Sequence, residues 1–188
     1  MSSPGKPLKV LIVTQFYYPD VTACAFRMQE TALLLAQMGC DVHVIAGEPH
    51  KGQIAGQAIN DGAIKVSRVK LVKYEGRGKW NYITHYLSFM FAAIKAARRH
   101  PGKFDIIWAS SPPLFTGIAG MAIAWLKKAR FCLDIRDIWP ESAVVAGQIK
   151  ADSMMFRMAK IVEYVLYKAA ARITCVARPM ARSFSIIV

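Results

Sequence analysis

The sequence concentrates charged residues in one short stretch, Phe131–Ser142, directly after an apolar run. The stretch begins as a buried strand should, and it then places Asp134, Arg136, Asp137 and Glu141 within eight residues. In open α/β sheets, ligands bind outside the carboxyl ends of the strands. Because carboxylates and a guanidinium at such a position can hold a polar ligand, the stretch predicts a binding or catalytic site.

A purely structural role explains the same charges. Asp137 and Glu141 can cap the helix that follows, and Arg136 can pair with a carboxylate. At this point the sequence leaves both interpretations open.

Three further loops are expected to meet this stretch at the same edge, because each follows a predicted strand. They are residues 15–27, 47–53 and 110–113. Together the loops carry hydroxyls, carboxylates, arginines and aromatic rings, and the helix starts near Thr22 and Pro113 favour a phosphate. This composition predicts a pocket for a hydroxyl-rich, partly anionic ligand.

Sequence motifs for nucleotide cofactors, metals and nucleophilic catalysis do not occur. The loop 15–25 contains no glycine, so the Gly-x-Gly-x-x-Gly motif is missing, and there is no phosphate-binding lysine loop. No Gly-x-Ser-x-Gly elbow is present. The 4 cysteines form no Cys-x-x-Cys pair, so neither a metal nor a cofactor is expected.

Predicted strands and helices alternate along the chain, which is typical of α/β proteins with a parallel sheet. We expect a Rossmann-like parallel sheet of about six or more strands with helices on both faces, in the order 3-2-1-4-5-6. The predicted strands are residues 9–14, 41–46, 63–72, 104–109, 131–135 and 172–176. The predicted helices are residues 23–38, 80–99, a helix opened by 110–113, and 153–171.

The chain of 188 residues fits one domain, and its net charge of +13 is spread from Lys65 to Arg182. This charge predicts an anionic partner: a phosphate, a nucleic acid or a lipid headgroup. No nucleic-acid reader motif is recognisable, so nucleic acid is not expected.

One predicted helix, residues 80–99, carries a wider apolar stripe than one core face needs and has basic flanks. That pattern is typical of a helix on an anionic membrane, although burial on two sides explains it equally well. Another apolar row, along the predicted helix 153–171, consists of Met154, Met158, Ile161 and Val165. No apolar run is long enough to span a bilayer as a helix.

Four segments resemble bacterial glycosyltransferases of the family 4 type, and the likeness covers nearly the whole chain. They are Tyr17–Pro19, Arg27 on the following helix, Ser110–Leu114 and Asp134–Ser142, with Arg-Asp-Ile-Trp-Pro-Glu-Ser as the most specific string. The chain is most similar to sugar transferases of O-antigen, capsule and exopolysaccharide synthesis. The resemblance implies the N-terminal half of a GT-B fold, with residues 1–188 as a single acceptor-side domain and the donor-binding domain absent.

The same resemblance implies an enzyme that acts on a lipid-linked or saccharide acceptor in the cytoplasm, at the inner face of the plasma membrane. Asp137 lies where the family presents an acceptor-side polar residue, and a carboxylate there can accept the proton of the acceptor hydroxyl. Further substrate contacts are expected from Tyr18, Arg27, Ser110, Ser111, Arg136 and Glu141. A nucleotide sugar is the implied co-substrate, although Thr22–Ala25 replaces glycines that relatives often place near its phosphate.

A non-catalytic binding module, or the remnant of a truncated glycosyltransferase gene, is the alternative function. Under either hypothesis the isolated chain is expected to be inactive without a donor-binding domain or subunit. The apolar segment Phe184–Val188 also predicts self-association.

Overall fold

The structure is a computed structural model that describes residues 6–49, 64–72 and 79–177. The described strands form one parallel sheet in the order β3-β2-β1-β4-β5-β6, as predicted. The strands are β1 (Lys9–Thr14), β2 (Asp41–Gly47), β3 (Ile64–Val69), β4 (Ile106–Ser111), β5 (Arg130–Ile135) and β6 (Arg172–Cys175).

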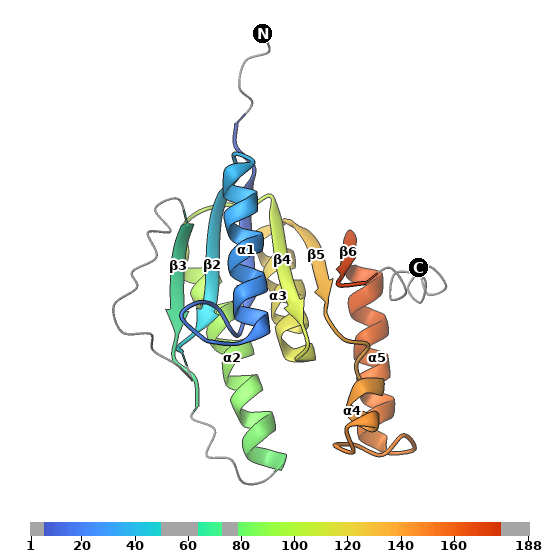
Figure 1. The fold of residues 1–188 in the computed structure, drawn as a ribbon. Helices are drawn as coiled ribbons and strands as arrows, with labels where there is room; N and C mark the ends of the chain where they lie inside the picture. The colour runs from blue at the N-terminus through green and yellow to red at the C-terminus, as the bar shows by residue number, and fades with distance from the viewer. Residues whose placement is uncertain (1–5, 50–63, 73–78, 178–188) are drawn as a thin grey trace.

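Helices cover both faces of this sheet, which confirms the Rossmann-like α/β class. Helix α1 lies on one face, and α2, α3 and α5 pack on the core of the other face (Figure 1). The helices are α1 (Ala23–Gln37), α2 (Lys79–Arg99), α3 (Leu114–Lys127), α4 (Glu141–Val145) and α5 (Met154–Ala169). Residues 50–53 of the predicted loop 47–53 and the apolar segment Phe184–Val188 lie outside the described residues.

The central strand β1 is buried on both faces, which explains its continuous run of aliphatic residues. Leu11 and Val13 enter the core under α2, α3 and α5, whereas Val10 and Ile12 enter the core under α1. Because side chains alternate along each strand, the same division decides which face a polar residue of β4, β5 or β6 meets.

Helix α3 lies close to the sheet because glycines face its neighbours. A Cβ atom added at Gly120 would lie 2.3 Å from the Cβ of Ala109 on β4. One added at Gly117 would lie 2.8 Å from the side-chain end of Leu166 on α5.

Strand β4 begins and ends two residues later than predicted. Its last residues, Ser110 and Ser111, continue the ladder with Asp134 and Ile135 of β5. The prolines after them precede α3 rather than opening it, because Pro113 keeps an extended backbone at the N-cap. Both serines therefore belong to the sheet and not to a loop.

Helices α2 and α5 differ in where their apolar residues point. In the described part of α2, Phe89 and Met90 are buried, and Phe91 is the one large apolar side chain that is strongly exposed. Helix α5 begins after Ser153, whose hydroxyl accepts a hydrogen bond from the Phe156 N–H. Its predicted apolar row faces solvent instead of the core.

Within the described residues, no helix combines the length and the apolar composition that a membrane crossing requires.

Replacing Gly120 with alanine is expected to destabilise the fold, although alanine normally stabilises a helix by about 1 kcal/mol relative to glycine. The new methyl group would meet Ala109 Cβ at 2.3 Å, and β4 cannot retreat without disturbing its ladder. Overpacking of this kind costs about 1–3 kcal/mol, which urea denaturation of the purified chain would measure.

The matched control is Gly117→Ala in the same helix. Its methyl group would meet first the flexible end of Leu166, so its cost should be smaller. Equal losses of stability in the two variants would contradict a tight helix–strand contact at Gly120.

Candidate functional site at the carboxyl edge of the sheet

A buried carboxylate, Asp134 of β5, lies at the centre of the candidate site. Its Oδ1 accepts a 2.7 Å hydrogen bond from Arg27 Nη2 on α1 and a 2.8 Å hydrogen bond from the Thr174 hydroxyl on β6. A buried charge is costly without such partners. The contact therefore ties the amino-terminal half of α1 to β5 and β6.

Several polar atoms near Asp134 are buried without a hydrogen-bond partner among the described residues. They are Asp134 Oδ2, Arg27 Nε, Ser110 Oγ and Trp108 Nε1. Ser110 lies directly opposite Asp134 in the ladder, and Trp108 precedes it by two residues on the α1 face. Donors and acceptors with unused capacity on one face can bind the hydroxyl groups of a polar ligand.

A groove of about 560 Å³ lies on the sheet beside this carboxylate. Trp108, Cys132 and Thr174 line it, and Arg130 and Arg172 add positive charge. Helix α1 lies over the middle of the sheet and leaves the β5–β6 side of this face uncovered (Figure 1). The groove thus lies on the same face as Asp134, and Thr174, a hydrogen-bond partner of Asp134, lines it.

The thiol in this groove is not a nucleophile. Burial of Cys132, with a smaller contribution from the nearby Asp134, raises the pKa of its thiol to about 11, and Arg172 opposes the shift. The thiol therefore stays protonated at neutral pH, and the thiolate is the reactive form of cysteine.

Arg136 holds the loop that follows β4. Its backbone N–H donates to the Ser111 carbonyl at 2.8 Å, and its guanidinium donates to the Pro112 carbonyl. Among the described residues it forms no ion pair, so the predicted pairing with a carboxylate is wrong. Ser111 alternates with Ser110 along β4, so the two predicted site serines point to opposite faces of the sheet.

The remaining carboxylates of the charged stretch have different environments. Asp137 is exposed after β5 and takes no hydrogen bond or ion pair within the described part of the chain. Glu141 is the first residue of α4, and its Oε1 lies 2.8 Å from Lys160 Nζ on α5. The N-cap of α4 is Pro140 and no side chain caps it, so the capping interpretation is wrong. Asp137 is therefore available to a ligand.

Lys160 joins α4 to α5 through two carboxylates. Its ammonium contacts both Glu141 and the buried Glu163, and Glu163 accepts a 2.7 Å hydrogen bond from the Tyr167 hydroxyl. Burial alone would lower the pKa of Lys160, but its hydrogen bonds to Glu141 and Glu163 outweigh burial and raise the pKa. Lys160 therefore stays charged at neutral pH, and α5 determines where Glu141 lies.

Arg68 of β3 holds the loop after β1, which carries Tyr18. Its guanidinium donates to the carbonyls of Gly47, at 2.8 Å, and of Tyr17 and Tyr18. It also lies 5.7 Å from the centre of the Tyr17 ring. Burial lowers the pKa of Arg68 from its usual value, and the nearby Asp20 opposes that shift. The hydrogen bonds from Arg68 thus fix the backbone that carries Tyr18 at the edge of the site.

Two polar contacts near the site were not predicted. His85 of α2 is buried, with its Nε2 2.8 Å from the Gln15 amide nitrogen and its Nδ1 donating to the Val72 carbonyl at 2.7 Å. The helical phase of α2 turns His85 toward the end of β1. The sequence could have indicated the face on which Thr174 lies. Side chains alternate along β6, and the two apolar neighbours of Thr174 on this strand pack on the core of the opposite face.

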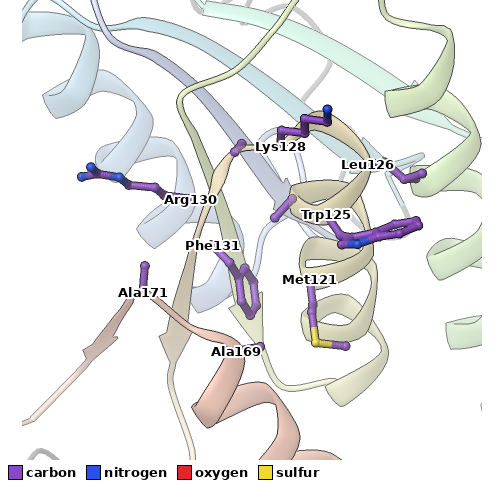
Figure 2. A pocket seen from close by; sticks show the side chains of 10 residues that line it. Met121, Trp125, Leu126, Lys128, Arg130, Phe131, Ala169 and Ala171 are labelled. Carbon is purple, nitrogen blue, oxygen red and sulfur yellow. The ribbon is translucent and has the colours of Figure 1, made fainter.

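A separate hollow of about 760 Å³ lies at the other edge of the sheet (Figure 2). Its lining comes from the carboxyl ends of α3 and α5 and from the start of β5, and it includes Met121, Trp125, Phe131 and Ala169. The strands end at the opposite edge, where the predicted site residues gather. This hollow is therefore not part of the candidate site.

Comparisons with known proteins agree with this arrangement. The family model for the Glycosyl transferase 4-like domain matches residues 22–185. The chain is similar in structure to Acinetobacter baumannii MurG, with a TM-score of 0.50 and 14% identity over 90% of this chain and 41% of that chain. It is also similar to Arabidopsis thaliana UGT89C1 in complex with UDP-L-rhamnose, with a TM-score of 0.60 and 11% identity over 96% of this chain and 45% of that chain.

The chain spans less than half the length of either solved structure. At these identities the structural likeness concerns the fold alone, which is Rossmann-like α/β. No curated protein matches the sequence significantly.

Asp134→Asn is expected to lower the free energy of unfolding by about 1.5–3 kcal/mol, because hydrogen bonds to a charged group contribute about that much. The substitution removes the charge that Arg27 and Thr174 contact in a buried setting. Urea denaturation followed by circular dichroism would measure the loss.

The same substitution in an exposed ion pair, Asp41→Asn, is the matched control. The Asp41 carboxylate lies 3.9 Å from Lys9 Nζ, with the two side chains 41% and 38% exposed. Exposed pairs contribute about 0–1 kcal/mol, so this variant should be nearly as stable as the original chain. A loss as large as that of Asp134→Asn would contradict the special role of the buried carboxylate.

Proposed function

The chain belongs to the Glycosyl transferase 4-like domain family, and we propose that it binds the acceptor in a nucleotide-sugar-dependent glycosyltransferase of bacterial surface polysaccharide synthesis. The observation that carries the proposal is the family match over residues 22–185 on a Rossmann-like domain. Because the chain covers 41% and 45% of the two solved structures, the activity is proposed for this domain together with a donor-binding domain or subunit.

The proposed acceptor is a saccharide carried on a membrane lipid. This part of the proposal rests on the Arg-Asp-Ile-Trp-Pro-Glu-Ser string, which resembles transferases of O-antigen, capsule and exopolysaccharide synthesis. The net charge of +13 would also attract the chain to anionic headgroups. The proposed location is the cytoplasmic face of the plasma membrane.

In the proposed reaction, the carboxylate of Asp137 takes the proton of the acceptor hydroxyl. The hydroxyl oxygen bonds to the anomeric carbon of the donor sugar, and the bond from that carbon to the nucleotide phosphate oxygen breaks with its electron pair. Asp137 suits this role because it is exposed and unpaired within the described residues. A general base of this kind contributes about 10²–10⁴-fold to the rate.

The buried polar atoms around Asp134 are proposed to bind the hydroxyl groups of the acceptor sugar. Asp134 Oδ2 can accept a hydrogen bond, and Ser110 Oγ can donate or accept one. Arg27 is already paired with Asp134, so it would contribute a directed N–H and not a free positive charge. Groups held on strands in this way are preorganised for binding.

In the chain assembled with its donor-binding domain, Asp137→Asn is expected to lower kcat by about 10²–10⁴-fold, because an amide cannot accept the proton. Sugar transfer from a panel of nucleotide sugars to a lipid-linked saccharide would measure the change. Near-normal turnover would exclude Asp137 as the base.

Asp152→Asn is the control, since Asp152 is an exposed carboxylate in the loop before α5. The variant carries the same change in charge and should keep its turnover. Saccharide binding without transfer in the assembled, unmutated protein would favour a non-catalytic binding module.

The isolated chain is expected to bind nucleotide sugars more weakly than micromolar. The loop before α1 has no glycine to bring its backbone close to a phosphate, and the Thr22 hydroxyl already accepts the Ala25 N–H at 3.1 Å. Calorimetric titration with several nucleotide sugars tests this expectation. Micromolar binding of any donor would contradict the assignment of donor recognition to another domain or subunit.

A further inference from the structure

Helix α5 turns a continuous apolar row toward solvent. The exposed fractions of the row are 72% for Met154, 60% for Met158, 64% for Ile161 and 44% for Val165. Their spacing of three or four residues places them on one stripe of the helix. The other side of α5 is already packed, with Ala159 and Leu166 buried. The row is therefore apolar surface that the described fold does not bury.

The exposed side of α5 carries only positive charge. Arg157 and Lys168 are exposed next to the row. Glu163 is the one carboxylate of the helix, and it is buried in contact with Lys160 and Tyr167. The exposed face thus combines apolar side chains with cations and presents no carboxylate of its own.

The length and border of this face suit a helix that lies parallel to a membrane. Sixteen residues form a helix about 24 Å long, and α5 has this length. Tyr164 is 54% exposed, and Lys168 Nζ lies 5.8 Å from the centre of its ring. Aromatic and basic side chains beside an apolar row are typical of helices in the headgroup region.

The same helix adjoins the candidate site. Helix α4 and the amino end of α5 lie at the carboxyl edge of the sheet (Figure 1). The contact of Lys160 with Glu141 joins α5 directly to the charged stretch after β5. A membrane under α5 would therefore lie close to the edge at which the strands end.

We propose that this face of α5 binds an anionic lipid bilayer. The face is defined as Met154, Met158, Ile161 and Val165 with Arg157 and Lys168. Its charges favour anionic headgroups, to which each nearby cation contributes about fivefold in affinity. The proposal deepens the proposed function and rests on it, because a lipid-linked acceptor must be reached from the membrane surface.

Helix α2, on which the sequence predicted this contact, offers less apolar surface in its described part. Phe89 and Met90 are buried in the core, which accounts for much of the width of its stripe. Phe91 is 64% exposed, the same fraction as Ile161 on α5. These two residues therefore form a matched pair for a test.

The experiment is flotation of the purified chain with vesicles of phosphatidylcholine containing phosphatidylglycerol, at low salt. Ile161→Glu is expected to reduce the bound fraction on the order of tenfold, because it replaces an apolar side chain that the bilayer would bury. Phe91→Glu should bind as the unmutated chain does. Charge reversal at Arg157 and Lys168 should reduce binding about tenfold or more, and so should pure phosphatidylcholine vesicles.

Several outcomes would overturn the proposal. They are no flotation of the unmutated chain, loss of binding in Phe91→Glu but not in Ile161→Glu, or equal binding to uncharged vesicles. Loss of self-association in Ile161→Glu, seen by light scattering with flotation unchanged, would assign the face to a second copy of the chain.

Circular dichroism would show that each variant is folded. Failure of the proposed function is distinguishable, since Asp137→Asn would remove sugar transfer without changing flotation. Ile161→Glu should still transfer sugar to an acceptor without a lipid.

Discussion

A carboxylate that is fully buried must be paired, and the candidate site is built on this requirement at Asp134. Its partners come from distant parts of the chain, Arg27 at a separation of 107 residues and Thr174 at a separation of 40 residues. The pairing therefore ties the first helix to the last described strand. Among the described residues, it also leaves one carboxylate oxygen and one guanidinium nitrogen buried without a hydrogen-bond partner, and Thr174 lines the groove on the same face.

The arginines of the carboxyl edge mostly hold the protein itself. Arg136 donates to the carbonyl of Pro112, and Arg68 donates to the carbonyls of Gly47, Tyr17 and Tyr18. Backbone carbonyls in loops need donors when they are enclosed, and a guanidinium can serve several at once. The dense charge of this edge thus divides into groups that fix the loops and a smaller set, with Asp137 the clearest case, that stays open to a ligand.

The distribution of apolar surface follows from the order of the strands. Helices α2, α3 and α5 share one core, and α3 lies between the other two against the middle of the sheet. Helix α2 contacts α3 and the strands β2 and β3, whereas α5 contacts α3 and β5 toward the end of the sheet. A helix with fewer neighbours buries a narrower stripe, so the apolar row of α5 stays exposed beside the site.

The alternation of apolar runs and amphipathic segments determined the class of fold and the strand order, because these depend on local periodicity and on the handedness of crossovers. The pairing of Asp134 with Arg27, the burial of His85 and the outward face of α5 were decided only by the tertiary structure. A periodic pattern tells which residues share a face of a helix or strand. Which face is covered, and by which charge, depends on elements that are distant in the sequence and meet only in the folded chain.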